Sequence, residues 1–139
     1  MTTINLNNVK VGDELPTLQL PPVRRFDLAM FAGSSGDHNP IHIDLDFAKK
    51  AGYPDVFAQG MLSMAWLGRL MTNWAPQTRL RSLSGRFTNM THLQDVITCS
   101  GKVTEIFEAN GERRARVAIQ TANQEGKVTI GGEAVVALG

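Results

Sequence analysis

The strongest helical pattern in the sequence is GMLSMAWLGRLMTNW, which runs from Gly60 to Trp74. Its apolar residues stand at positions 61, 62, 64, 65, 66, 67, 70, 71 and 74. On a helical wheel they cover most of the circumference, whereas a surface helix shows a narrower apolar stripe. We therefore expect a helix over residues 60–74 that is buried on nearly all sides.

The residues after this helix, from Arg79 onward, change to a period of two, which is typical of strands. Apolar and polar residues alternate over Val96–Val103 and again over Ala115–Thr121, and a third run covers Val128–Leu138. The polar turn at Asn123–Gly126 predicts that the last two runs form a hairpin. We expect an antiparallel sheet of about four to six strands packed against the long helix, an α+β arrangement.

The residues before the helix have a mixed pattern. Residues 1–22 are expected to form an extended lead-in, and Phe26–Ala32 has helical spacing. The segment Gly33–His42 is rich in turn-forming residues and is expected to be an ordered loop. Leu45–Ala51 predicts one or two helical turns, with Asp44 as the N-cap.

The composition is that of one globular domain, which we expect to cover residues 1–139. The chain has 139 residues and a mass of 15.2 kDa, within the usual size of a single domain. Its hydrophobic fraction of 42% and charged fraction of 19% exclude a disordered chain. With 14 basic and 13 acidic residues the formal net charge is +1, so the composition gives no support to a nucleic-acid partner.

The cysteine content and the apolar segments indicate a protein of the reducing cytoplasm. The lone cysteine, Cys99, cannot form an intrachain disulfide and is expected to be a small buried apolar residue. The start MTTINLNNVKVGDELP lacks the basic and apolar regions of a signal peptide. The longest apolar stretch, Met61–Met71, is interrupted by Gly68 and Arg69, and a membrane span needs about 20 apolar residues. We expect no membrane partner.

The segment from Gly36 to His42, GDHNPIH, combines an acid and an imidazole on one predicted turn. Pro40 restricts the backbone, and the side chain of Asn39 can accept a hydrogen bond from its own turn. The carboxylate of Asp37 and the imidazole of His42 can therefore meet in one small volume. A rigid loop of this kind suits general acid–base chemistry on a water molecule.

Two other interpretations of the same residues stay open at this point. The segment is also ordinary turn chemistry, with Asp37 as a helix cap and His42 at the start of a helix. A metal site would draw on Asp37, His38, His42 and Asp44, but no cysteine or second spaced histidine pair supports it, and His92 is distant in the sequence. We expect no metal.

GDHNPIH resembles the signature of the MaoC-like (R)-specific enoyl-CoA hydratases and 3-hydroxyacyl dehydratases. That signature reads G-D-x-N-P-[IL]-H and continues with an acidic residue and an alanine, as Asp44 and Ala48 do here. The segment Ala58–Leu62, AQGML, resembles the A-[HQ]-G-M turn that leads into the central helix of the family.

Later segments continue the resemblance in the same order. Arg86–Phe87 is similar to the Arg-Phe strand of the family, and Gly132–Ala134 to its closing strand. The sequence departs from the family at Met90, where a proline is usual, and at Gln94–Asp95, where Gly-Asp is usual.

The resemblance implies a hot-dog fold, a curled antiparallel β-sheet wrapped around one long central helix. It implies a hydro-lyase that reversibly hydrates trans-2-enoyl thioesters to (R)-3-hydroxyacyl thioesters, with Asp37 and His42 as the catalytic pair. Gly60 matches the position whose backbone N–H faces the thioester oxygen, a role suited to a helix N-terminus. Asn39 would orient the loop, and Met61 would adjoin the substrate.

The resemblance also implies the carrier and the assembly. Coenzyme A or an acyl carrier protein would carry the substrate, and no other cofactor is expected. Members of the family pair edge to edge, so we expect a homodimer or higher homo-oligomer. A heterodimer with a second hot-dog subunit is the alternative, and this chain would then be its catalytic member. A hot-dog thioesterase would need a carboxylate on or near the long helix, and Gly60–Trp74 contains none.

Overall fold

The structure, a computed structural model, describes residues 4–139, so the first residues of the predicted lead-in and of the N-terminal start lie outside it. Its centre is a five-stranded antiparallel sheet with the strand order β1-β3-β4-β5-β2. The strands are β1 (Leu18–Gln19), β2 (Leu80–Phe87), β3 (Thr98–Ala109), β4 (Glu112–Ala122) and β5 (Val128–Ala137).

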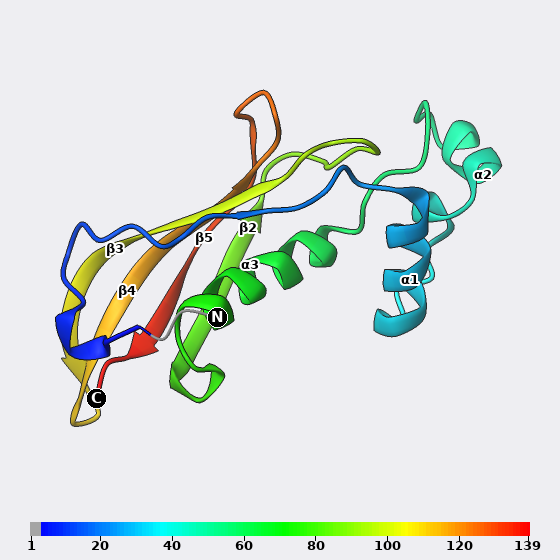
Figure 1. Ribbon diagram of the computed structural model, residues 1–139. Coiled ribbons are helices and arrows are strands. Elements are labelled where there is room, and N and C mark those ends of the chain that lie inside the picture. Colours follow the sequence, from blue (N-terminus) through cyan, green and yellow to red (C-terminus); the bar gives the residue numbers. More distant parts are fainter. Residues whose placement is uncertain (1–3) are drawn as a thin grey trace.

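The α-helices are α1 (Arg25–Ser35), α2 (Leu45–Lys50) and α3 (Gly60–Trp74), and short 3₁₀ turns lie at Leu6–Asn8, Pro40–His42 and Gln77–Arg79. Figure 1 shows α3 lying along the curled sheet, with α1 and α2 beyond its N-terminal end. This arrangement confirms the expected curled antiparallel sheet with one long helix. None of the helices within residues 4–139 is long and apolar enough to span a membrane.

The alternation predicted for the second half of the chain is confirmed in β4. Ala115, Val117, Ile119 and Thr121 are all buried, at 3% exposure or less, while Ala118 and Gln120 between them are exposed. β4 and β5 pair antiparallel around the predicted polar turn. The sheet therefore presents one apolar face to the helix.

One face of α3 packs against the sheet, but the expectation that this helix is buried on nearly all sides is wrong. Leu67, Leu70 and Met71 are at most 1% exposed, whereas Met61 is 56% exposed and Ala65 is also exposed. Within residues 4–139 the face that carries Met61 and Ala65 borders an open hollow beside Leu83 of β2. The apolar residues on the wheel therefore serve a core on one side and an open surface on the other.

A second, smaller core fixes α1 and α2 to the first turns of α3. It joins Leu28 of α1, Ala48 of α2 and Leu62 of α3 with Val23 and Val56. Fully burying one aliphatic side chain of this size stabilises a fold by about 1.5–3 kcal/mol. This packing holds the loop between α1 and α2 against the N-terminal end of α3.

α1 extends further than the sequence indicates. The loop expected from Gly33 onward begins only after Ser35, because a single glycine is tolerated inside a helix. The helix stops at Gly36, whose φ of 78° is left-handed and whose N–H donates to the Ala32 carbonyl at 3.1 Å. At the next helix the predicted cap is confirmed, since Asp44 Oδ1 accepts hydrogen bonds from the N–H groups of Asp46 and Phe47.

Candidate active site

A chain of short-range hydrogen bonds fixes the loop from Ser35 to Ile41. The Asp37 N–H donates to Ser35 Oγ at 3.1 Å, and Asp37 Oδ1 accepts from the Asn39 N–H at 3.3 Å. Asn39 Oδ1 accepts in turn from the Ile41 N–H at 3.1 Å. Each bond closes a tight turn, so the loop presents Asp37 and the following 3₁₀ turn in a defined orientation.

His42 is buried, and a main-chain carbonyl sets which of its ring nitrogens carries the hydrogen. The distance from His42 Nδ1 to the Phe57 carbonyl oxygen is 2.7 Å. A carbonyl only accepts, so Nδ1 carries the hydrogen, and the lone pair of the neutral ring is at Nε2. The Phe57 ring also packs edge-on against the imidazole, with ring centroids 5.2 Å apart. The ring is therefore held in one orientation with Nε2 free for chemistry.

Asp37 and His42 lie together. Asp37 Oδ2 is 3.9 Å from His42 Nε2, too far for a direct hydrogen bond. A separation of this size is often bridged by water. An ionised carboxylate and the bare Nε2 are both acceptors, so a water molecule between them would donate one hydrogen to each.

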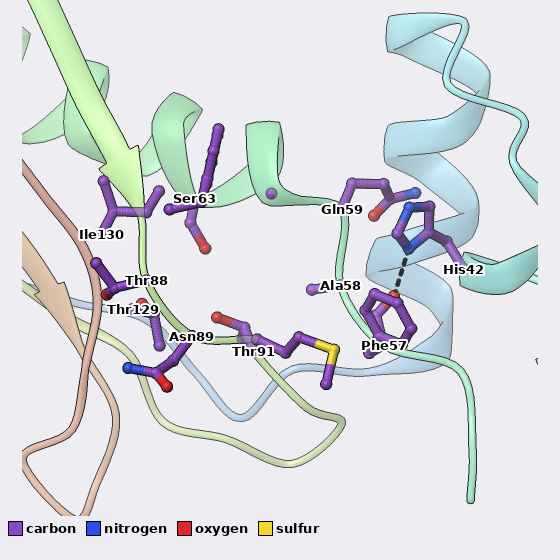
Figure 2. A pocket seen from close by; sticks show the side chains of 13 residues that line it. His42, Phe57, Ala58, Gln59, Ser63, Thr88, Asn89, Thr91, Thr129 and Ile130 are labelled. Atoms are coloured by element: carbon purple, nitrogen blue, oxygen red, sulfur yellow. Dashed lines mark hydrogen bonds between the residues drawn. The ribbon is translucent and has the colours of Figure 1, made fainter. Parts of the chain in front are cut away.

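Gly60 is the first residue of α3, and its N–H is an unused donor. Neither Gly60 nor Met61 donates a backbone hydrogen bond to any acceptor in the part of the chain that the structure describes. Gly60 and His42 line the same cavity, of about 340 Å³. Figure 2 shows His42 at this cavity. A Cβ at Gly60 would lie 2.9 Å from Cε1 of Phe87, so any larger residue here would displace this ring.

Gln59, the N-cap of α3, ties this helix to α1. Its side chain is fully buried, and Nε2 donates to the Leu28 carbonyl at 2.9 Å. Its Oε1 has no hydrogen-bond partner within residues 4–139. The contact to Leu28 holds the peptide that carries the Gly60 N–H.

The two members of the Asp37–His42 pair line two different hollows. The cavity on the His42 side has several polar walls, including Ser63, Thr91 and Asn89. The hollow on the Asp37 side measures about 620 Å³ and is mostly apolar. Its floor is one stripe of α3, made of Met61, Met64, Ala65 and Gly68. Met61 therefore lines the same hollow as Asp37 and lies outside the core.

The other reactive side chains singled out in the sequence lie elsewhere or serve structural roles. Asp44 caps α2, and His38 is exposed. No three His, Cys, Asp or Glu side chains gather into a metal-binding group within residues 4–139. Cys99 is fully buried in β3, and burial raises the pKa of its thiol to about 12, which suppresses the thiolate.

Comparison with known proteins assigns the chain to a protein family. Residues 7–127 match the MaoC like domain family. The chain belongs to this family. The MaoC-like chain is 30% identical over 112 residues to the (R)-specific enoyl-CoA hydratase of Rhodospirillum rubrum, covering 79% of this chain and 76% of that protein. It is 31% identical over 109 residues to the fatty acid synthase subunit beta of Saccharomyces cerevisiae, covering 76% of this chain but only 5% of that protein.

Among solved structures, the MaoC-like chain is similar to the unliganded R-hydratase PhaJ1 of Pseudomonas aeruginosa. The TM-score is 0.85 at 30% sequence identity, and the match covers 97% of this chain and 86% of that one. The fold is therefore the hot-dog fold of the MaoC-like hydratases.

Sequence reasoning missed several parts of the MaoC-like site. The Phe57 carbonyl has no signal in the sequence, because every residue carries one. The hydroxyl groups of Ser63 and Thr91 come from segments that only the fold brings to one cavity. Ser63 offered one signal, since it is the only hydroxyl residue within the apolar stretch Met61–Met71.

Proposed function

We propose that this MaoC-like protein is a hydro-lyase that adds water to trans-2-enoyl thioesters, giving (R)-3-hydroxyacyl thioesters, and catalyses the reverse reaction. The observation that carries the proposal is the pair of acceptors, Asp37 Oδ2 and His42 Nε2, held 3.9 Å apart, with each residue lining one of the two hollows. That pair suits a water molecule whose oxygen lone pair is left free to attack carbon.

The proposed reaction begins with the water held between the two acceptors. Asp37 orients and deprotonates the water while His42 Nε2 binds it, and a C–O bond forms at Cβ of the substrate. The π electrons of the Cα–Cβ bond move toward the thioester carbonyl and give an enolate. The pair then returns one proton to Cα, with His42 taking part in this delivery. One proton is taken and one is returned, so the pair is restored in each cycle.

The Gly60 N–H is the proposed donor to the enolate oxygen. It is unused within the described residues, lines the cavity with His42 and stands at the N-terminus of a 15-residue helix. The helix dipole adds to the attraction for a developing negative charge. Asn39 keeps the loop in place through its bond to Ile41 and takes no part in proton transfer.

The apolar hollow is the proposed site of the acyl chain. Its α3 stripe includes the small residues Ala65 and Gly68, which leave width between Met64 and Leu83 of β2. Burying apolar acyl surface there is favourable in proportion to the area removed from water. The carrier is coenzyme A or an acyl carrier protein, and no other cofactor is proposed.

A second copy of the chain is the proposed partner. β2 pairs only with β5, so its other edge is unpaired within residues 4–139. Met61, Phe87 and Met90 expose between 42% and 56% of their surface around the two hollows. Edge pairing through β2 would remove the open edge and cover the apolar hollow.

Substitutions of the pair test the proposal. Asp37→Asn and His42→Ala should each lower turnover of a short trans-2-enoyl-CoA by roughly 10²- to 10⁴-fold, because each removes a group that handles the proton. The exposed neighbours provide matched controls, Asp46→Asn in α2 and His38→Ala in the same loop. Near-normal hydration by either variant of the pair would refute the assignment.

Measuring the free thiol that is released from an acyl thioester distinguishes a thioesterase from a hydratase. Asp37 lines the same hollow as Met61 and Met64 of α3, so a thioesterase, which needs a carboxylate near the helix, is the alternative to test. The hydratase proposal expects a 3-hydroxyacyl thioester with its thioester bond intact. Release of free thiol in step with substrate loss would instead establish the thioesterase.

A further inference from the structure

Two buried hydroxyl groups face the cavity without partners. Ser63 is 2% exposed and Thr91 is 5% exposed, and both line the cavity that contains His42 and Gly60. Neither side-chain hydroxyl forms a hydrogen bond within residues 4–139. Neither oxygen is enclosed by protein atoms, unlike Gln59 Oε1, so both are open to the space of the cavity.

The two hydroxyl groups come from different elements, and both elements are firmly placed. Figure 2 shows Ser63 reaching into the cavity from α3, and Thr91 on the segment that follows β2. The main-chain carbonyl of Thr91 accepts a hydrogen bond from the Ala58 N–H at 2.9 Å, which fixes this wall beside the start of α3. The pair is therefore a preformed feature of the cavity.

Three neighbouring residues of the cavity, Thr88, Asn89 and Thr129, already use donor groups within the described residues. Thr88 Oγ1 and Asn89 Nδ2 donate to the Val128 carbonyl at 3.0 and 2.7 Å. Thr129 shares a hydrogen bond of 2.7 Å with Thr121. Buried polar groups are nearly always hydrogen-bonded, so the free capacity of Ser63 and Thr91 points to a polar ligand group.

The position of Ser63 and Thr91 indicates which part of the proposed substrate would lie near them. The proposed thioester has an apolar acyl arm, which the Met61–Gly68 stripe accommodates, and a pantetheine arm that carries amides. Ser63 lies three residues after Gly60, about 4.5 Å further along the helix axis. In pantetheine only two methylene groups separate the thioester sulfur from the first amide nitrogen, so this amide stays close to the oxygen held at Gly60.

We propose that Ser63 and Thr91 form a hydrogen-bonding subsite for the first amide of the pantetheine arm. A hydroxyl group can donate to the amide carbonyl or accept from the amide N–H, so the two together can satisfy both ends. The subsite rests on the proposed function for its ligand, a thioester of coenzyme A or acyl carrier protein. The two carriers share this amide.

Binding of saturated thioesters tests the subsite without any turnover. Titration calorimetry would compare butanoyl-CoA, butanoyl-N-acetylcysteamine, which keeps the first amide, and an S-alkyl butanethioate of equal length without an amide. Ser63→Ala and Thr91→Val should each raise Kd for the two amide-bearing ligands by about three- to tenfold, the effect of one hydrogen bond. Kd for the S-alkyl ligand should change less than about twofold.

Two further variants serve as controls. Thr91→Ser keeps the hydroxyl and should bind all ligands like the wild type. Thr88→Val alters the same cavity at a hydroxyl already bound to Val128, so it should affect the three ligands equally. A uniform loss for all ligands in Ser63→Ala and Thr91→Val, or no loss at all, would overturn the subsite. So would a wild type that binds neither amide-bearing ligand.

Failure of the subsite and failure of the proposed function give different results. Selective loss of amide-bearing ligands by a protein that never hydrates an enoyl thioester would keep the subsite and refute the hydratase. Normal hydration with no amide-selective loss in Ser63→Ala and Thr91→Val would support the hydratase and refute the subsite.

Discussion

The tautomer and orientation of the His42 imidazole are set by a main-chain atom, the carbonyl oxygen of Phe57. The Phe57 carbonyl accepts from Nδ1 and so leaves the lone pair at Nε2, on the side of Asp37. The bond is short, and the ring is largely shielded from water. Both features keep the tautomer and the ring orientation constant, which is the preorganisation that the proposed acid–base reaction requires.

Gly60 is the residue at which the smallest change should have the clearest effect. The Cβ of Gly60→Ala would lie 2.9 Å from the Phe87 ring, so the ring must shift and the Cβ enters the cavity beside the Gly60 N–H. We expect turnover of a trans-2-enoyl-CoA to fall by about 10- to 100-fold, because a displaced donor loses most of its value. Thermal unfolding should be nearly unchanged, since alanine favours the helix.

Gly33→Ala in α1 is the matched control for this substitution, because a Cβ there meets no atom within 4 Å. It should leave activity at the wild-type level. Full activity of Gly60→Ala would show that this N–H is not needed.

Gln94 has a left-handed backbone, with φ at 70°, at the place where the family usually has a glycine. A side chain in this conformation costs about 1–2 kcal/mol. Replacing it by glycine removes that cost but adds about 0.5–1 kcal/mol of unfolded-chain entropy. We therefore expect Gln94→Gly to unfold at the same or a higher temperature than the wild type.

Gln120→Gly in the exposed face of β4 is the comparison for Gln94→Gly, since its backbone is ordinary strand. It should lower Tm by a few degrees. Circular dichroism would measure the thermal unfolding of both variants. An equal loss of Tm in both would contradict the backbone strain at Gln94.

Helix α3 shows how far an apolar pattern can be interpreted. Its predicted range, Gly60–Trp74, is the observed one. Its burial was predicted wrongly at Met61 and Ala65, because a helical wheel counts apolar residues without knowing what covers them. Likewise Gly33 made α1 look shorter than it is, although one glycine inside a helix costs only about 1 kcal/mol.

The candidate site was predictable where its members are neighbours in sequence. Asp37 and His42 stand five positions apart, with turn-forming residues between them, and the structure brings them together. Ser63 and Thr91 are 28 positions apart and meet only through the packing of α3 against the segment after β2. No local pattern could have paired them.

Glu112 at the start of β4 links strands through ion pairs that depend on pH. It accepts from Nε of Arg81 in β2 and from Nε of Arg114, both at 2.7 Å. The Arg81 guanidinium, followed by that of Arg114, lowers the pKa of Glu112 from 4.5 to about 2. Its contribution to stability is therefore present above about pH 4.5 and is lost as pH falls toward 2.

Glu112→Gln should accordingly have a lower Tm than the wild type at pH 7, and the difference should shrink below pH 4.5 and vanish near pH 2. Glu125→Gln, at a glutamate without an ion pair among the described residues, should show no such trend. A difference in Tm that stays constant from pH 7 to pH 2 would rule out the ionised form of Glu112 as its source.

The whole molecule is expected to work as a pair. Light scattering after gel filtration should give a molar mass of about twice the 15.2 kDa of the chain. Activity per chain should fall on dilution once the pair dissociates, because the hollow beside Asp37 then loses its cover. A 15.2 kDa species with undiminished activity would exclude this assembly.

A chain that is inactive alone and gains activity with a second hot-dog subunit would instead establish the heterodimer.

The hydrogen bond between His42 and the Phe57 carbonyl has a consequence for how such a protein can change over generations. Phe57 stands only three residues before Gly60, so the carbonyl that orients His42 and the proposed oxyanion donor are joined through one short piece of main chain. The Met61–Gly68 stripe lies on another face of the same helix. If the proposed function holds, substitutions there would change the acyl preference and leave the geometry around His42 and Gly60 unchanged, so substrate choice could vary while the chemistry is kept.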